Sequence, residues 1–272
     1  GTYAALAASY FTEPGIVCAV GNDFPREMID LLHRRKVDTK GLTIDPDGKT
    51  FFWAGRYGED PNQRTTLQTE VNVLADYRPE LPEAYREADI LFLGNIDPEQ
   101  QEEILTQTEK ARLVAMDTIR LWIDTKRDAL IRTLRNVDVF FANDEEVSLI
   151  TGEKNLITAC RRLLEMGPSL IVAKKGEHGA ILLGEDLIFG IPARPCEKVV
   201  DPTGAGDSFA GGFLGFLDKV GSIDQRDFRK AAVYGSVMAS FVIEDFGIER
   251  LKSLDEEEIE ERFDEFRRLV SF

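Results

Sequence analysis

Short apolar runs alternate with helix-like segments through the first two thirds of the chain, and this alternation limits the folds open to it. The apolar runs are Ile16–Val20, Ile90–Leu93, Leu113–Met116, Val137–Phe141 and Leu170–Ala173. The helix-like segments between them are Pro25–Arg35, Pro98–Lys110, Thr125–Leu134 and Leu156–Met166. Runs that are short and apolar throughout are typical of parallel strands covered on both faces. We therefore expect an α/β fold with a doubly wound sheet and helices on both faces.

Two segments interrupt this alternation. Residues 41–74 contain Pro46-Asp47-Gly48 between apolar runs, which is a hairpin signal, and then two strand-like stretches, Lys49–Tyr57 and Arg64–Val73. We expect 41–74 to form a small β appendage inserted into a core made of residues 1–40 and 75–272. Further short strands are predicted at Ala180–Leu183, Leu187–Ile191 and Lys198–Val200. Helices are predicted near both ends, at 1–8, 207–219, 226–242 and 255–270.

The composition argues against several classes of protein. The chain has 272 residues, 43% of them hydrophobic, and no apolar run approaches the ~18 residues of a transmembrane helix. The formal net charge of −16 disfavours nucleic acid or an anionic membrane as a partner, because both repel a negative surface. Cys18, Cys160 and Cys196 are an odd number at irregular spacing. This predicts no disulfide framework and favours a cytoplasmic location.

The chemistry of the chain is concentrated between Asp201 and Gly212, in the sequence Asp-Pro-Thr-Gly-Ala-Gly-Asp-Ser-Phe-Ala-Gly-Gly. The small residues Gly204, Ala205 and Gly206 let backbone N–H groups approach an anion, and a helix that follows adds the positive end of its dipole. Asp207, in the first turn, is placed to accept a proton from a hydroxyl. These parts suit transfer of a phosphoryl group to an alcohol. Taken alone, the stretch is more simply explained as a glycine loop in which Asp207 caps the helix.

The same stretch, with the two residues after it, resembles at every defined position the C-terminal signature of the PfkB/ribokinase family of carbohydrate and nucleoside kinases. The order of the elements is similar to that family over essentially the whole chain. The resemblance implies a ribokinase-like fold with 41–74 as its lid, Asp207 as the catalytic base and the 204–206 amides as the anion hole. Asp201 matches a position that in some members helps to bind a monovalent cation such as K⁺. A turn-forming Asp-Pro explains Asp201 equally well.

Asn143 and Glu146 follow the apolar run at 137–141 and have the spacing of a helix N-cap and its capping-box partner. That structural explanation would be sufficient in an unrelated protein. The resemblance implies a second role, because an Asn-x-x-Glu at this place is similar to the family motif that organises Mg²⁺ near the ATP phosphates. A carboxylate acting through water suits Mg²⁺.

The resemblance also implies a site for ATP. Lys175 and Gly176 lie in a Lys-Gly-x-x-Gly sequence that borders the nucleotide in similar proteins, and Thr203 adjoins the anion hole. Gly235 and Ser236 are candidates for the adenine pocket, because a helix rich in small residues can approach a planar base. The alternative for Gly235 and Ser236 is simple core packing, and for Lys175 a solvated side chain.

The acceptor site is less defined. Arg56, Arg64 and Asn62 in the predicted lid, and Arg120 after the run at 113–116, are candidates for binding an acceptor or phosphate. Surface charge on a hairpin is the alternative for the residues in the predicted lid. The aromatic residues at 51–53 suit capping of a substrate, packing within the lid, or a homodimer formed through the lid.

Similar proteins begin with a strand and an acidic sugar-binding residue that this sequence does not show. We therefore expect roughly 25–40 further residues upstream, since the doubly wound sheet would otherwise lack a central strand. The resemblance implies an ATP-dependent phosphotransferase that uses Mg²⁺ and acts on the hydroxymethyl group of a sugar. The alternatives are a nucleoside kinase and a ligand-binding protein without activity on the same fold.

Overall fold

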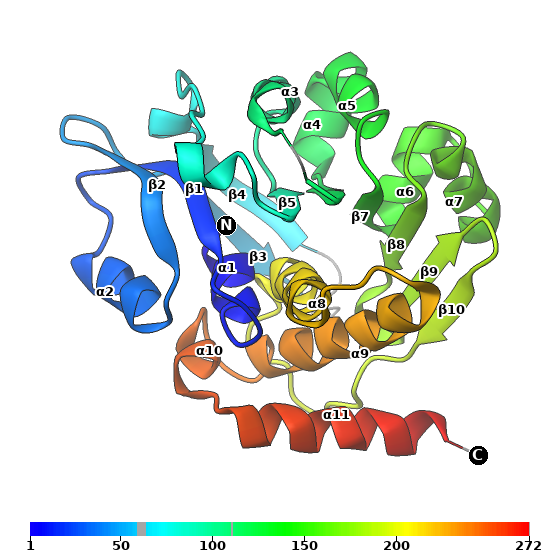
Figure 1. Cartoon of the computed structure of the whole chain (residues 1–272). Coiled ribbons are helices and arrows are strands. Elements are labelled where there is room, and N and C mark those ends of the chain that lie inside the picture. The colour runs from blue at the N-terminus through cyan, green and yellow to red at the C-terminus, as the bar shows by residue number, and fades with distance from the viewer. Residues whose placement is uncertain (59–63, 110, 272) are drawn as a thin grey trace.

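The computed structural model describes residues 1–58, 64–109 and 111–271, and its main sheet has the strand order β10-β9-β8-β7-β6-β5 (Figure 1). The strands are β5 (Ile90–Leu93), β6 (Leu113–Asp117), β7 (Val139–Asn143), β8 (Leu170–Lys174), β9 (Ala180–Gly184) and β10 (Ile188–Ile191). Strands β5 to β8 are parallel, whereas β9 and β10 are antiparallel to their neighbours. The sheet is therefore mixed, with a parallel part where the apolar runs predicted it.

Helices cover both faces of this sheet (Figure 1). On one face lie α1 (Thr2–Ala8), α8 (Ala205–Val220), α9 (Gln225–Val242) and α11 (Glu256–Val270), with the short α10 (Glu249–Ser253) beside them. On the other face lie α3 (Pro98–Gln107), α4 (Arg120–Thr125), α5 (Arg127–Leu134), α6 (Asp144–Thr151) and α7 (Leu156–Leu164). This arrangement confirms the predicted α/β fold with helices on both faces.

Two hydrophobic clusters fill the space between the sheet and its two helical layers. Phe140 and Phe141 are neighbours on β7, both fully buried, and they belong to different clusters. Successive strand residues point to opposite faces, so a strand covered on both sides must be apolar at every position. Burial on both faces therefore explains why the apolar runs of the sequence are unbroken.

The segment predicted as a lid is divided between two small sheets. Strand β1 (Gly15–Gly21) pairs in parallel with β2 (Asp38–Asp45), and α2 (Arg26–Arg34) connects them. Strand β3 (Phe52–Tyr57) pairs antiparallel with β4 (Arg64–Glu70). The hairpin predicted at Pro46-Asp47-Gly48 is therefore wrong, because this turn joins strands of different sheets. Residues 41–45, in β2, pair with β1, which was predicted as a strand of the core. The hairpin is formed by β3 and β4.

Other boundaries differ in ways that have local causes. No strand forms at the predicted Lys198–Val200, where the N–H of Val200 instead donates to the carbonyl of Ile243 at 2.8 Å, a contact between loops. The predicted strand Arg64–Val73 stops at Glu70, and Asn72–Leu74 forms a 3₁₀ turn, as does Glu83–Tyr85. The helix predicted at Thr125–Leu134 forms as α5, whereas the separate helix α4 ahead of it was not predicted; Lys126, at φ −132°, divides the two.

Helix α8 is packed closely on both sides. A side chain at Gly211 would overlap the carbonyl of Ala4 in α1, and one at Gly212 would lie 2.9 Å from the carbonyl oxygen of Tyr234 in α9. Glycine therefore allows α1 and α9 each to approach α8 at nearly backbone distance. This packing fixes the position of the α8 N-terminus, which carries the glycine–aspartate sequence.

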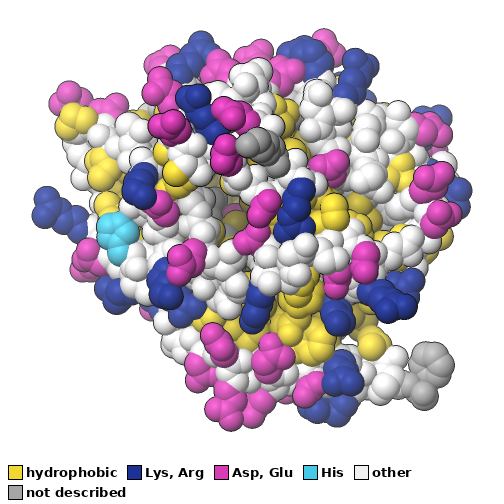
Figure 2. All heavy atoms as spheres, viewed as in Figure 1, with side chains coloured by type: hydrophobic (Ala, Val, Ile, Leu, Met, Phe, Trp, Pro, Cys, Tyr) yellow, Lys and Arg dark blue, Asp and Glu magenta, His cyan; other side chains and the backbone are white. Residues whose placement is uncertain are grey.

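Acidic and basic side chains are mixed over much of the face in Figure 2, with acidic ones gathered at its lower edge over α11. The first turn of α11 contains Glu256, Glu257 and Glu258. Among the described residues, no helix is both long enough and apolar enough to cross a membrane.

Candidate active site

The carboxyl ends of three parallel strands bring polar residues to one edge of the sheet. Asp117 ends β6, Asn143 ends β7 and Lys174 ends β8. The strand register places Asn143 opposite Lys174 and Asp117 opposite Phe141. Ligands of open α/β sheets bind beyond this edge. The topology therefore assembles a polar site from residues that are far apart in the sequence.

A tight loop leads from Asp201 into α8. Gly204 is the N-cap residue of the helix with φ +82°, in the left-handed region, and a side chain there would overlap the ring of Tyr3. Both reasons require glycine at this position. Burial, together with the carboxylates of Asp201 and Asp207, raises the pKa of Tyr3 to about 12, so its phenol remains neutral.

Asp201 is buried and connects two loops through its carboxylate. Its Oδ1 accepts a hydrogen bond from the N–H of Thr203 at 2.9 Å, and its Oδ2 accepts one from the N–H of Gly247 at 3.2 Å. Such bonds are expected if Asp201 serves to form a turn. Carboxylate oxygens retain further lone pairs, so the cation-binding role stays a prediction.

Asp207 lies in the first turn of α8, directly after Gly204, Ala205 and Gly206. Amide groups at a helix N-terminus bind anions, and α8 directs the positive end of its dipole to the same place. The ammonium nitrogen of Lys174 lies 3.1 Å from the position that a Cβ of Gly206 would take. The predicted base, the predicted anion-binding loop and a cation are therefore adjacent.

Lys174 and Asp117 form an ion pair at 2.9 Å, and only 17% and 6% of their side chains are exposed. Burial alone would lower the pKa of Lys174, but the carboxylates of Asp117, Glu146 and Asp207 outweigh it and raise that pKa. Lys174 is therefore protonated at neutral pH. It interacts with both the base candidate Asp207 and the metal candidate Glu146.

Asn143 and Glu146 form the predicted capping box at the start of α6. The N–H of Glu146 donates to Asn143 Oδ1 at 2.7 Å, and the N–H of Asn143 donates to Glu146 Oε2 at 2.8 Å. Glu146 is 5% exposed. The two bonds fix the orientation of a buried carboxylate at the edge of the sheet that holds Lys174.

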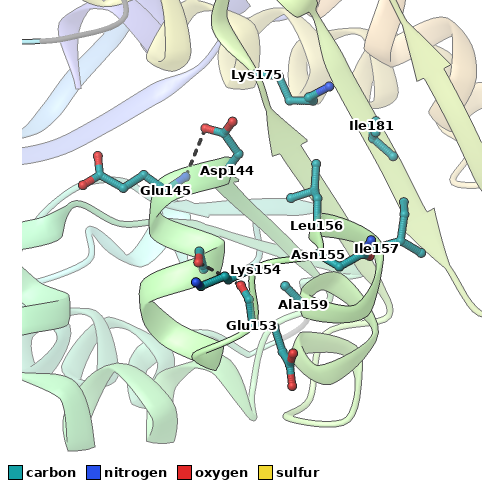
Figure 3. Close-up of a pocket in the computed structure, with 11 residues that line it drawn as sticks. Asp144, Glu145, Glu153, Lys154, Asn155, Leu156, Ile157, Ala159, Lys175 and Ile181 are labelled. Atoms are coloured by element: carbon teal, nitrogen blue, oxygen red, sulfur yellow. Dashed lines mark hydrogen bonds between the residues drawn. The ribbon is translucent and has the colours of Figure 1, made fainter.

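A pocket of about 460 Å³ lies beside this edge, between α6, α7 and the β8–β9 connection (Figure 3). Lys175 and Ile181 line one side, and Asp144 and Glu145 at the start of α6 line another. None of residues 201–207 is among its lining residues, so the pocket does not include the predicted anion-binding loop. Gly176 follows in a 3₁₀ turn, Gly176–His178, at φ +53°.

Gly235 and Ser236 lie in α9, and both are buried. A side chain at Gly235 would lie 2.8 Å from the carbonyl oxygen of Phe209 in α8. Gly235 therefore has a packing role between two helices, which is the alternative stated for it above. Its contact with adenine, and that of Ser236, stay predictions.

Among the described residues, a contact from Tyr57 joins the predicted lid to the predicted anion-binding loop. The hydroxyl of Tyr57, at the end of β3, lies 3.1 Å from the hydroxyl of Thr203. Arg56 on the same strand is exposed. The side chain of Arg64 and all of Asn62 lie outside the described residues. Arg120 lies apart from the lid in α4, is 60% exposed, and pairs with Asp124 at 3.3 Å and Glu145 at 2.6 Å.

Comparison with known proteins identifies the family. The model of the pfkB family of carbohydrate kinases matches residues 3–253. The chain belongs to this family. The protein is thus a kinase, a phosphotransferase with an alcohol group as acceptor, as the glycine–aspartate sequence predicted.

Individual relatives have several names. The cytidine kinase of Thermococcus kodakarensis is 34% identical over 218 residues, which are 78% of this chain and 76% of that protein. The 2-dehydro-3-deoxygluconokinase of Escherichia coli K12 is 26% identical over 273 residues, covering 89% and 82% of the two chains. These PfkB relatives therefore include both a nucleoside kinase and a sugar kinase.

Solved structures share the fold. The nucleoside kinase of Methanocaldococcus jannaschii superposes with a TM-score of 0.78 at 21% identity, over 97% of this chain and 85% of that one. A structure from E. coli that contains ATP and Mg²⁺ gives a TM-score of 0.77 at 20% identity, over 98% and 87%. The fructokinase of Vibrio cholerae, with fructose, ADP and calcium, gives 0.79 at 19% identity, over 96% and 89%.

The donor set of this PfkB kinase fits a magnesium ion that accompanies a nucleotide. Among the described residues, no three His, Cys, Asp or Glu side chains gather in a metal-binding group. Mg²⁺ bound with a nucleotide uses one or two carboxylates and takes its remaining ligands from phosphates and water. The buried carboxylate of Glu146, fixed by its capping box, suits such a partial site.

Two charged residues at this edge of the sheet, Lys174 and Asp117, were not among the predicted site residues. The predicted site residues nearest to them in the sequence were Lys175 and Arg120. The buried ion pair is instead formed by Lys174, which precedes Lys175, and by Asp117, which lies near Arg120 in the sequence. Both end apolar strands, and a charged residue that directly ends a buried strand was the available signal. The contact of Tyr57 with Thr203 had no signal, because it joins two regions 146 residues apart.

Proposed function

We propose that this kinase transfers the γ-phosphoryl group of MgATP to a hydroxymethyl group on the sugar moiety of a nucleoside. The observation that carries the proposal is the position of Asp207 in the first turn of α8, directly after the Gly204–Gly206 loop and beside Lys174. A base, an anion-binding loop and a cation in one place are the parts that phosphoryl transfer needs.

In the proposed reaction, Asp207 accepts the proton of the acceptor hydroxyl. The hydroxyl oxygen forms a bond to the γ-phosphorus, and the bond from that phosphorus to the β–γ bridging oxygen breaks, which releases ADP. The amides of Gly204–Gly206 and the positive end of α8 stabilise the charge on the transferred group. Asn143 and Glu146 would hold the Mg²⁺ that neutralises the phosphates when bound.

The choice of a nucleoside rests on two observations. The cytidine kinase named above is 34% identical over most of both chains. In addition, the lid exposes apolar rings, since Phe51 and Phe52 are 39% and 47% exposed. Exposed aromatic rings on a closing hairpin can stack on a base. Closure over the acceptor would also exclude water and limit hydrolysis of ATP.

A sugar without a base is the second candidate. It is favoured by the 2-dehydro-3-deoxygluconokinase, whose similarity to this chain is lower but covers more of it. ATP consumption should be measured over a panel of nucleosides, pentoses, hexoses and sugar phosphates. A kcat/KM highest for a nucleoside supports the proposal, and one highest for a free sugar or sugar acid replaces it with the second candidate. Consumption of ATP at the same rate with and without every acceptor of the panel would reject both.

Three further parts of the proposal rest on the sequence and the resemblance. They are a homodimer formed through the lid, activation by a monovalent cation near Asp201, and a cytoplasmic location. The three cysteines, Cys18, Cys160 and Cys196, are all free, as a reducing compartment would require. Sedimentation of the purified protein and its activity in K⁺ compared with Na⁺ test the first two.

A further inference from the structure

The buried pair of Lys174 and Asp117 needs an explanation beyond packing. Taking two charges out of water is costly, and a buried ion pair is weak support for stability because apolar residues of similar volume often serve as well. The pair lies at the carboxyl edge of the sheet, where strands β6 and β8 end. A costly pair at a ligand-binding edge points to a role in the reaction.

Asp117 is fixed by two bonds. Its Oδ1 accepts a hydrogen bond from the N–H of Thr118 at 2.9 Å, and its Oδ2 accepts one from Lys174 Nζ at 2.9 Å. A carboxylate with both oxygens engaged by donors is poorly suited to act as a second base. It is well suited to hold an ammonium group in one place, which makes Asp117 a positioning residue.

Lys174 is held on the side of the anion-binding loop. Its Nζ lies 3.1 Å from the position that a Cβ of Gly206 would occupy, so glycine leaves room for the ammonium beside the loop. An ammonium group has three N–H donors. Among the described residues its hydrogen-bond acceptor is Asp117, which leaves donor capacity for an oxygen that enters the site.

We infer that Lys174 binds the phosphoryl group that is transferred, and that Asp117 positions it. This inference rests on the proposed function. The ammonium would lie between the amides of the 204–206 loop and Asp207, where negative charge develops on the non-bridging oxygens. The chemistry recognised is that of a terminal phosphate, so the contact is made by ATP and is lost in ADP.

Binding measurements test the inference without any knowledge of the acceptor. Lys174→Met should weaken MgATP binding roughly 10- to 100-fold, as expected when a hydrogen bond to a charged group is lost. Binding of MgADP should change less than about threefold. An equal loss for both nucleotides would overturn the inference. Because no acceptor is present, the result does not depend on whether the acceptor is a nucleoside or a sugar.

A double variant separates the role in binding from a role in folding. Lys174→Met leaves the Asp117 carboxylate buried without its partner, which destabilises the fold, whereas Lys174→Met with Asp117→Asn removes both charges. The double variant should regain thermal stability but not the preference for ATP over ADP. Recovery of that preference would show that Lys174 only supports the fold.

Two further variants complete the design. Asp117→Asn alone should reduce the preference for ATP in the same direction but less, because Lys174 is kept and only loses its position. Lys126→Met is the matched control, since Lys126 also pairs with carboxylates, Asp97 at 3.5 Å and Glu99 at 2.5 Å, outside the site. The control should bind both nucleotides as the native protein does.

Discussion

The start of α8 and the β3–β4 hairpin are built in opposite ways. Every residue from Ser208 to Leu217 of α8 is buried, and glycines bring its neighbouring helices to backbone distance. On the hairpin, Phe52 and Leu67 are 47% and 57% exposed. Few buried contacts mean low local stability and easier movement. The start of α8 is therefore the more rigid of the two regions, and the hairpin is the one that can move more easily.

The largest effect should follow from changing Asp207. Asp207→Asn keeps the shape of the residue but removes its capacity to accept a proton, so kcat should fall by roughly 10²- to 10⁴-fold. The affinity for MgATP should change little, because the anion-binding loop is retained. The matched control is Asp227→Asn, an Asp in the first turn of α9, which should leave kcat unchanged. A kcat close to the native value in Asp207→Asn would show that Asp207, at the start of the rigid α8, is not the catalytic base.

A smaller effect should follow from Glu146→Gln. Glutamine can still accept the N–H of Asn143, so the capping box is kept while the charge is lost. The Mg²⁺ concentration for half-maximal activity should rise about 10- to 100-fold, as for residues that orient a metal and its ligands.

Glu258→Gln provides the control for that variant. Glu258 makes the same capping box with Asp255 in α11, far along the chain from the site. Its substitution should leave the Mg²⁺ requirement unchanged. If both variants required the same Mg²⁺ concentration for half-maximal activity, Glu146 would have no role beyond capping α6.

Gly211→Ala tests the rigidity of α8 itself. The new methyl group would meet the backbone of Ala4, which cannot move aside alone, so the free energy of unfolding should fall by about 1–3 kcal/mol. In contrast, a methyl group at Gly190 in β10 would meet no atom within 4 Å, and Gly190→Ala should be close to neutral. Denaturant unfolding of both variants measures the difference, and equal stabilities would contradict the close packing.

The smallest effect should come from the lid. Tyr57→Phe removes the hydroxyl that lies 3.1 Å from Thr203, a contact worth about 0.5–1.5 kcal/mol. The KM for the acceptor should rise by a few fold. Tyr85→Phe removes a similar bond of 3.0 Å to the carbonyl of Asp38, outside the site, and should leave this KM unchanged. A loss of stability without a change in KM would mean that the contact is structural.

A contrast between local and long-range contacts explains how much the sequence could predict. The strand Ile90–Leu93 and the capping box of Asn143 and Glu146 were predicted correctly, because each depends on residues close together in the chain. The turn at Pro46-Asp47-Gly48 was misinterpreted, since the local signal does not reveal which sheet each strand joins. Lys174 and Asp117 meet only through the order of the strands, 57 residues apart, and no local pattern records that meeting.

The fate of the γ-phosphate tests the central claim most directly. ³¹P NMR should follow MgATP with the best acceptor of the panel, for the native protein and for Asp207→Asn. We predict that the native protein converts the γ-phosphate into a phosphoester of the acceptor's hydroxymethyl group, and that Asp207→Asn binds MgATP but forms almost none. The account would be contradicted if the γ-phosphate appeared only as inorganic phosphate, or if the variant formed the phosphoester at the native rate.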